Sequence, residues 1–219
     1  MKIKAIVTGA TGMVGEGVLL ECLDNPDVEQ VLVLNRRPGG RSHPKLRELS
    51  GVDFFNLAPL ESQLAGHNAC FFCLGTSSVG MSQAEYERVT YDLTLSVAQV
   101  LARLNPEMTF CYVTGAGTDS SERGRVAWAR VKGRTENALL RLFKNAYMFR
   151  PGMMKAVPGQ KNLKPIYKAL AWIYPIGRAL YPKGFCTLQE VGRAMIHLAK
   201  AGSSKRIIDV PDIVELARA

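Results

Sequence analysis

A glycine-rich turn at residues 8–15 combines residue types that could bind phosphate groups. It has the sequence TGATGMVG and stands between a β-branched apolar run and a segment of helical period. Glycines at its second, fifth and eighth positions leave the backbone without Cβ atoms, and the free N–H groups of a following helix would attract a pyrophosphate. A tight turn without a ligand is the alternative. The residues expected to bind the pyrophosphate half of a dinucleotide are Gly9, Thr11, Gly12, Met13 and Val14.

Two arginines, Arg36 and Arg37, follow shortly after the expected second strand at 30–34. Position 35, directly after that strand, lies 20 residues beyond Gly15. A carboxylate at this point would hydrogen-bond the 2′-hydroxyl of an adenosine ribose and select NAD. The chain has no carboxylate there, and the two guanidinium groups could clamp a 2′-phosphate instead. The pattern therefore favours NADP over NAD, with two solvated surface arginines as the alternative.

A third candidate element follows the expected strand at 69–74, in the sequence LGTS. Gly75 would let the chain pass close to the ribose and nicotinamide of a cofactor, with Leu74 and Thr76 on either side of it. The hydroxyl groups of Thr76 and Ser77 could also face a substrate. We expect this element to border the nicotinamide half of the same cofactor site.

The five cysteines are odd in number and lie mostly in apolar runs. Cys70 and Cys73 have the CxxC spacing of a redox pair, but they lie within an expected strand rather than at a helix N-terminus. Buried, reduced thiols are therefore expected. Together with the lack of an apolar signal core at the start of the sequence, they predict a cytoplasmic protein.

The elements that must position these residues predict an α/β fold. Short β-branched runs alternate with longer segments of helical period, which is typical of a doubly wound parallel sheet, the Rossmann fold. Ligands of such sheets bind beyond the carboxyl ends of the strands. We expect one domain over 1–219 with a small irregular C-terminal lobe at 150–186, which could form a lid over a substrate. Strands are expected at 3–8, 30–34, 52–57, 69–74, 109–114, 146–149 and 206–210, and helices at 12–24, 44–49, 59–66, 81–104, 120–144 and 187–200.

The composition is basic, with 28 Lys and Arg against 19 Asp and Glu, for a formal net charge of +9. Such an excess suits anionic partners such as phosphates. The sequence has no nucleic-acid-binding pattern, so no nucleic acid is expected. Its three histidines lack metal-ligand spacing, so no metal is expected, and no stretch has the ~18 apolar residues that span a membrane. The aromatic and basic segment 165–182 is more typical of a substrate lid or a subunit contact than of a membrane interface.

Several ordered motifs give the chain a resemblance to the short-chain dehydrogenase/reductase superfamily, in its atypical NADP-binding branch. More narrowly, it resembles the Tat-interacting-protein-like oxidoreductases of that branch. The resemblance covers about residues 1–155 and implies a nicotinamide cofactor, NADP, on a Rossmann fold. The matching stretches lie at 8–15, 35–37, 73–76, 88–92, 131–133 and 149–152.

The resemblance also implies a catalytic group of a serine or threonine, a tyrosine, and a lysine four residues beyond the tyrosine. Lys132 occupies the lysine position, but Trp128 stands where the tyrosine is expected. An indole N–H donates a hydrogen bond and is no practical proton shuttle. Thr114 lies near the hydroxyl position and is the candidate catalytic hydroxyl. Substitutes for it are Thr118, Ser120 and Ser121.

Lys132 keeps a second implied role without the tyrosine, which is to hold the hydroxyls of the nicotinamide ribose. The backbone after the last matching strand is implied to meet the nicotinamide, and its residues are Pro151, Gly152 and Met153. We therefore expect an NADP(H)-dependent oxidoreductase that transfers a hydride to a small carbonyl or conjugated acceptor. A non-catalytic NADP(H)-sensing regulator is the alternative. A sugar-nucleotide epimerase is disfavoured because such enzymes use the missing tyrosine. The helices at 81–104 and 120–144 could form the surface of a homodimer.

Overall fold

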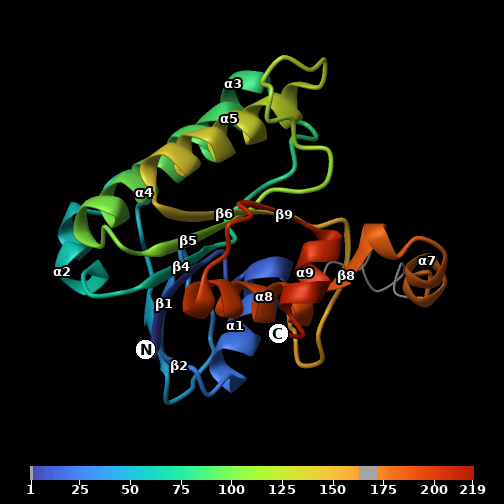
Figure 1. Cartoon of the computed structure of the whole chain (residues 1–219). Helices are drawn as coiled ribbons and strands as arrows, with labels where there is room; N and C mark the ends of the chain where they lie inside the picture. The colour runs from blue at the N-terminus through green and yellow to red at the C-terminus, as the bar shows by residue number, and fades with distance from the viewer. Residues whose placement is uncertain (1, 163–171) are drawn as a thin grey trace.

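Seven parallel strands form the central sheet of the computed structural model, which describes residues 2–162 and 172–219 (Figure 1). The strand order is β3-β2-β1-β4-β5-β6-β9, so the chain winds outward in both directions from β1. The carboxyl ends of β1 and β4 therefore meet at a topological switch point. The strands are β1 (Ile3–Thr8), β2 (Val28–Leu34), β3 (Leu46–Leu49), β4 (Ala69–Phe72), β5 (Thr109–Val113), β6 (Asn145–Arg150) and β9 (Ile207–Asp209).

Helices cover both faces of this sheet (Figure 1). One face carries α1 (Met13–Asp24), α8 (Leu188–Ala201) and α9 (Val210–Leu216). The other carries α2 (Glu61–Leu64), α4 (Leu93–Leu104) and α5 (Ala127–Leu142). A 3₁₀ turn, η1 (Ala58–Leu60), precedes α2, and α3 (Gln83–Glu87) continues through a π-helical segment, η2 (Arg88–Asp92), into α4. The predicted doubly wound α/β fold is confirmed.

Apolar side chains fill both interfaces between sheet and helices. Along β1, Ala5 and Val7 belong to the cluster beneath α1 and α8, whereas Ile6 belongs to the cluster beneath α4 and α5. In the second cluster the rings of Phe110 and Phe143 stack with their centroids 4.6 Å apart. Strands buried on both faces need continuous apolar runs, which is why the β-branched stretches were visible in the sequence.

The prediction for the connection between β2 and β4 was wrong in two places. The segment 44–49 was expected to be a helix, but Leu46–Leu49 pairs with β2 as an edge strand. The segment 52–57 was expected to be a strand, but Asp53 organises a turn there by accepting hydrogen bonds from the N–H groups of Phe55 and Asn56. A segment of four residues is too short for its hydrophobic period to distinguish a strand from a helix. Pairing of Leu46–Leu49 with β2 determined its conformation instead.

The helix expected at 120–144 begins later, at Ala127. The Asp119 carboxylate accepts hydrogen bonds from the N–H groups of Ser121 and Gly124, which holds the preceding residues in a loop. This loop rests directly on α5, because a Cβ added to Gly133 would lie 1.7 Å from the carbonyl oxygen of Asp119. The other predicted strands and helices are present with small shifts at their ends.

The predicted C-terminal lobe contains a short parallel pair of strands, β7 (Met153–Lys155) and β8 (Phe185–Thr187). Between them lie α7 (Tyr174–Leu180) and the 3₁₀ turn η3 (Pro182–Gly184). The first part of the aromatic segment expected at 165–182 lies outside the described residues. Figure 1 shows α7 at the edge of the molecule, away from the central sheet.

Replacing Gly133 by alanine should destabilise the protein, because the added methyl group would press α5 away from the loop after β5. We expect the free energy of unfolding to fall by about 1–3 kcal/mol, as for other overpacked sites. Urea unfolding measures the change. Gly75→Ala is the matched control, since its Cβ would have no atom within 4 Å. Equal unfolding midpoints for the two variants would contradict the close contact.

Candidate cofactor-binding site

A cleft of about 620 Å³ opens beyond the carboxyl ends of β1, β2 and β4. Three predicted motifs border it together, although they lie far apart in the sequence. Leu34 and Asn35 lie at the end of β2 beside it. The other lining residues are Gly9, Thr11, Arg36, Arg37, Pro38, Phe54, Leu74 and Asn162.

The glycine turn has the geometry that a phosphate-binding turn requires. Gly9 has φ +70°, and a Cβ on it would lie 2.7 Å from the carbonyl oxygen of Cys73, just after β4. A Cβ on Gly15 would lie 2.2 Å from the carbonyl oxygen of Gly9. Gly12 is the N-cap of α1 and supplies no side-chain cap, which leaves the N–H groups of the first turn available for a phosphate. The residues present therefore fit a dinucleotide pyrophosphate.

The loop that carries Arg36 and Arg37 is organised by Glu48 of β3. One oxygen of this carboxylate accepts hydrogen bonds from the Asn35 amide at 2.7 Å and from the Gly39 N–H at 2.6 Å. Both ends of the arginine loop are thereby tied to the edge strand. Arg36 and Arg37 themselves are exposed at the mouth of the cleft, where an anionic group could reach them.

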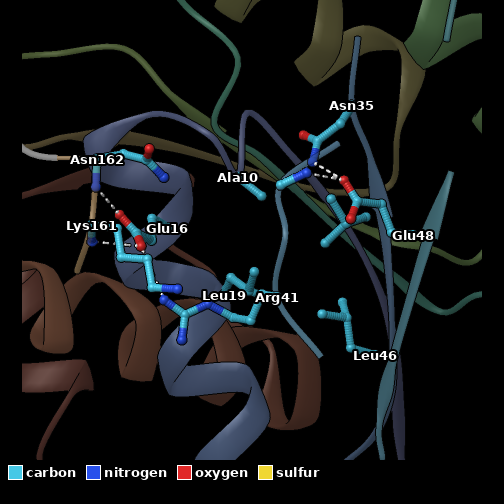
Figure 2. Close-up of a pocket in the computed structure, with 11 residues that line it drawn as sticks. Ala10, Glu16, Leu19, Asn35, Arg41, Leu46, Glu48, Lys161 and Asn162 are labelled. Atoms are coloured by element: carbon cyan, nitrogen blue, oxygen red, sulfur yellow. Dashed lines mark hydrogen bonds and ion pairs between the residues drawn. The ribbon is translucent and has the colours of Figure 1, made fainter. Parts of the chain in front are cut away.

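A buried carboxylate, Glu16, ties residues 159–162 to the start of α1 (Figure 2). It accepts hydrogen bonds from the N–H groups of Lys161 and Asn162, each at 2.8 Å, and pairs with Arg41 at 3.0 Å. A cavity of only about 20 Å³ remains between these groups and the sheet. The contact places Asn162 on the border of the cofactor cleft, and no local pattern in the sequence indicated it.

The residues predicted for the nicotinamide half also come together in part. The Lys132 ammonium on α5 donates a hydrogen bond to the Thr114 carbonyl oxygen at 2.6 Å. The Cβ position of Gly115 is 4.0 Å from both the Lys132 Nζ atom and the Pro151 carbonyl oxygen, and Ala116 donates its N–H to Pro151 at 3.0 Å. Burial lowers the pKa of Lys132, and the nearby Glu136 opposes this shift.

Glu136, one turn after Lys132, forms a buried cluster that the sequence analysis missed. Its side chain is 0 % exposed and pairs with Arg150, whose pKa it raises. The Thr114 hydroxyl donates to Glu136 at 2.7 Å or to the Phe149 carbonyl oxygen at 3.0 Å. To reach a substrate, this hydroxyl would have to leave these partners, and its catalytic role stays a prediction. The sequence did contain one sign of this cluster: Lys132 and Glu136 are four residues apart, so they share one face of a helix.

The substitute hydroxyls also form local hydrogen bonds. Thr118 donates to the Gly115 carbonyl oxygen at 2.8 Å, Ser121 donates to the Asp119 carboxylate at 2.6 Å, and Ser120 accepts from Arg150. None of the three points to a substrate position by its contacts, so the choice among them stays a prediction.

The remaining predicted residues do not line the cleft. Met13 and Val14 form the first turn of α1, and Gly75 and Thr76 are exposed after β4. Gly152 packs against η3, because its Cβ would lie 2.3 Å from the Gly184 carbonyl oxygen, and Met153 is exposed. The half-buried Trp128 ring packs beside Gly117, 3.5 Å from the Cβ position of that glycine.

The described residues give less support to a metal site, a reactive thiol or a membrane-spanning helix. Within them, no group of three or more His, Cys, Asp or Glu side chains could hold a metal ion. All five cysteines are free, and burial raises the pKa of Cys73 to about 12, which disfavours a reactive thiolate. No helix in ranges 2–162 and 172–219 is long and apolar enough to cross a membrane. A homodimer through α4 and α5 stays a prediction.

The fold and the glycine turn define a class of protein, the doubly wound α/β proteins of Rossmann type. Solved structures of that class superpose on the chain. ADP-L-glycero-D-manno-heptose-6-epimerase of Helicobacter pylori has a TM-score of 0.67 at 16 % identity, over 99 % of this chain and 81 % of the enzyme. MoeE5, in complex with UDP-glucose and NAD, has a TM-score of 0.68 at 17 % identity, over 98 % of this chain and 80 % of that protein. At these identities the likeness shows the fold.

Sequence comparison finds relatives that are similar over most of the chain, although no family profile matches it. Protein FMP52, mitochondrial, of Eremothecium gossypii is 26 % identical over 227 aligned positions, which cover 99 % of this chain and 98 % of the relative. Protein HTATIP2 of Rattus norvegicus is 28 % identical over 208 positions, covering 91 % and 82 %. The predicted resemblance to Tat-interacting-protein-like members of the superfamily is confirmed.

The prediction of a cytoplasmic protein is contradicted by these relatives. Four of them, all called FMP52, carry the word mitochondrial in their names. The prediction depended on reduced cysteines and on the lack of an apolar signal core. Neither property separates one reducing compartment from another, so they could not decide the location.

The lowered pKa of Lys132 makes a prediction for the pH dependence of stability. In the unfolded chain the pKa returns to about 10.5, so the unfolded state binds this proton more tightly than the folded state. The contribution of Lys132 to stability therefore rises with pH between its folded pKa and 10.5. Lys132→Met lacks this rise and should be at least as stable as the wild type at neutral pH.

Thermal unfolding of both proteins from about pH 7 to pH 11 measures the difference, which should shift in favour of the wild type as the pH rises. Lys144→Met, at an exposed position, is the control. A difference between wild type and Lys132→Met that stays constant over this range would contradict the buried ammonium.

Proposed function

We propose that the protein binds NADP(H) and transfers a hydride to a small carbonyl or conjugated acceptor without a catalytic tyrosine. The observation that carries this proposal is the composition of the cleft. The cleft is lined by the glycine turn and by Arg36 and Arg37, and none of its described lining residues is acidic. A site that selects NAD would instead place a carboxylate at the end of β2.

Each part of the site has a role in holding the cofactor. The N–H groups at the start of α1 bind the pyrophosphate. Gly9, which has no Cβ, lets the turn before them pack against the Cys73 carbonyl oxygen. Arg36 and Arg37 bind the 2′-phosphate through charge-assisted hydrogen bonds. Lys132 binds the hydroxyls of the nicotinamide ribose, and the backbone at Pro151 borders the nicotinamide. When bound, NADPH supplies the hydride.

The reduction also needs a proton, and the structure offers no tyrosine to donate it. Trp128 stands four residues before Lys132, and its indole is a hydrogen-bond donor only. Acceptors such as quinones take up a hydride and draw the proton from water, so they balance the reaction without an acid from the protein. This supports a conjugated acceptor more than a simple ketone.

A non-catalytic NADP(H) sensor is the second candidate, and Trp128 also favours it. Such a protein would bind a partner with an affinity that changes when the cofactor binds, because a ligand shifts an equilibrium only through differential affinity. The names of MoeE5 and the H. pylori epimerase connect the fold with a UDP-sugar, NAD and epimerisation in those proteins. The missing tyrosine argues against sugar-nucleotide chemistry in this chain.

Calorimetric titration with NADPH and NADH tests the cofactor assignment. The wild type should bind NADPH at least about tenfold more tightly than NADH, because a charge-assisted contact contributes roughly 1.5–3 kcal/mol. Arg36→Ala/Arg37→Ala should remove this preference and leave NADH binding unchanged. The control Arg125→Ala/Arg218→Ala removes the same charge from exposed positions elsewhere and should keep the preference. Binding of neither nucleotide by the wild type would refute the proposal.

Substitution at Trp128 tests whether the protein lacks a general acid for the reduction of carbonyl groups. Trp128→Tyr restores the spacing of tyrosine and lysine and should raise NADPH-dependent reduction of ketones and aldehydes by about 10²-fold or more, the usual contribution of general acid catalysis. Trp128→Phe should not raise it, and all three proteins should reduce quinones at similar rates. If the wild type and both variants consume NADPH no faster than the blank with every acceptor, while binding it tightly, the sensor is the better account.

A further inference from the structure

Residues 157–162 lie across the start of α1, although they are far from it in the sequence, and we call them the strap. Hydrogen bonds join the strap to the first turn of that helix. The Gln160 side-chain amide donates to the Met13 carbonyl oxygen at 2.7 Å. The two oxygens of the Glu16 carboxylate accept from the last two N–H groups of the strap, each at 2.8 Å. The strap therefore lies against the helix end to which the proposed function assigns the pyrophosphate.

Further contacts fix the conformation of the strap. The Gln160 side-chain oxygen accepts a hydrogen bond from the Val157 N–H at 2.8 Å, which closes a turn within the strap. Arg41 donates to Glu16 at 3.0 Å and to the Gly159 carbonyl oxygen at 3.3 Å. Glu16 is only 2 % exposed, and a buried carboxylate needs such partners to compensate its charge. The strap and this carboxylate thus depend on each other.

The position of Asn162, the last residue of the strap, follows from these contacts. Its backbone is held by Glu16, and the residue lines the cofactor cleft together with Gly9 and Thr11 of the glycine turn. In Figure 2 the Asn162 side chain extends from the strap in the direction of Ala10. A side-chain amide has two N–H donors, so Asn162 can donate a hydrogen bond to an anionic oxygen in the cleft.

We propose that Asn162 is a further ligand of the cofactor, whose side-chain amide donates a hydrogen bond to the pyrophosphate, and that Glu16 is the positioning residue for this contact. The inference rests on the proposed function, because it takes the dinucleotide as the ligand of the cleft. The pyrophosphate fits better than the 2′-phosphate, because the strap is anchored to the first turn of α1. Arg36 and Arg37 instead follow β2.

Calorimetric titration of two Asn162 variants tests the contact. Asn162→Asp keeps the shape of the side chain and should weaken binding of both NADPH and NADH by at least about tenfold, because its carboxylate repels the phosphates. Asn162→Ala removes only the hydrogen bond and should weaken both by about 2–10-fold. The difference between the variants should shrink between about 0.05 and 0.5 M NaCl, since salt screens the repulsion. Gln99→Glu changes an exposed amide on α4 in the same way and should bind as the wild type does.

A double-mutant cycle tests whether Glu16 acts through Asn162. Glu16→Gln replaces one accepting oxygen by an N–H donor, so it should release the strap and weaken NADPH binding about as much as Asn162→Ala. Glu16→Gln/Asn162→Ala should bind no more weakly than either single variant, because both changes remove the same contact. Tighter NADPH binding by Glu16→Gln would show that the carboxylate merely repels the phosphates, and would overturn its positioning role.

Hydrogen exchange follows the strap without any nucleotide. Peptides that cover residues 157–162 should exchange faster in Glu16→Gln than in the wild type, whereas Asn162→Ala should leave their exchange unchanged. Equal exchange in Glu16→Gln and the wild type would contradict the anchoring of the strap by this carboxylate.

The titrations also separate this inference from the proposed function. Unchanged affinity of both Asn162 variants, beside a wild type that prefers NADPH, would overturn the inference and leave the proposed function intact. A loss confined to NADPH would place the amide at the 2′-phosphate and overturn the pyrophosphate contact. Binding of neither nucleotide by the wild type would overturn both.

Discussion

The parallel pairing of β1 with both β2 and β4 is the constraint on which the proposed cofactor site depends. Thr8, the last residue of β1, pairs with Leu34 on one side and with Phe72 on the other. The three strands therefore end at the same level, and the glycine turn, the arginine loop and Leu74 follow from there into one cleft. The approach is close enough that the Cys73 carbonyl oxygen leaves no room for a Cβ on Gly9.

The residues proposed for the nicotinamide half depend on a second interaction, the buried pair of Glu136 and Arg150. A fully buried carboxylate is stable only when its charge is compensated, and here Arg150 and the Thr114 hydroxyl supply that compensation. The same contacts tie α5 to the ends of β5 and β6. They thereby hold the Lys132 ammonium at the Thr114 carbonyl oxygen, where burial lowers its pKa.

Some segments of the chain could be predicted from the sequence and others could not, for physical reasons. The strand, turn and helix of residues 3–24 were predicted well because apolar periodicity and glycine spacing act together over a long stretch. The edge strand at Leu46–Leu49 was missed because four residues carry no clear period and only pairing with β2 selects their conformation. The late start of α5 at Ala127 reflects loop hydrogen bonds to Asp119 that compete with helical ones.

Local information in the chain was sufficient to predict the α/β class and the tight glycine turn between β1 and α1. It also showed that no carboxylate follows β2 and that Trp128 stands four residues before Lys132. These features depend on residue types and spacings that lie within a few turns of each other. Folding alone decided that Glu16 brings Asn162 to the cleft and that Glu136 meets Arg150. It also decided that α7 turns Ile176 and Leu180 outward. Contacts between distant segments arise from the packing of whole elements, which no local period encodes.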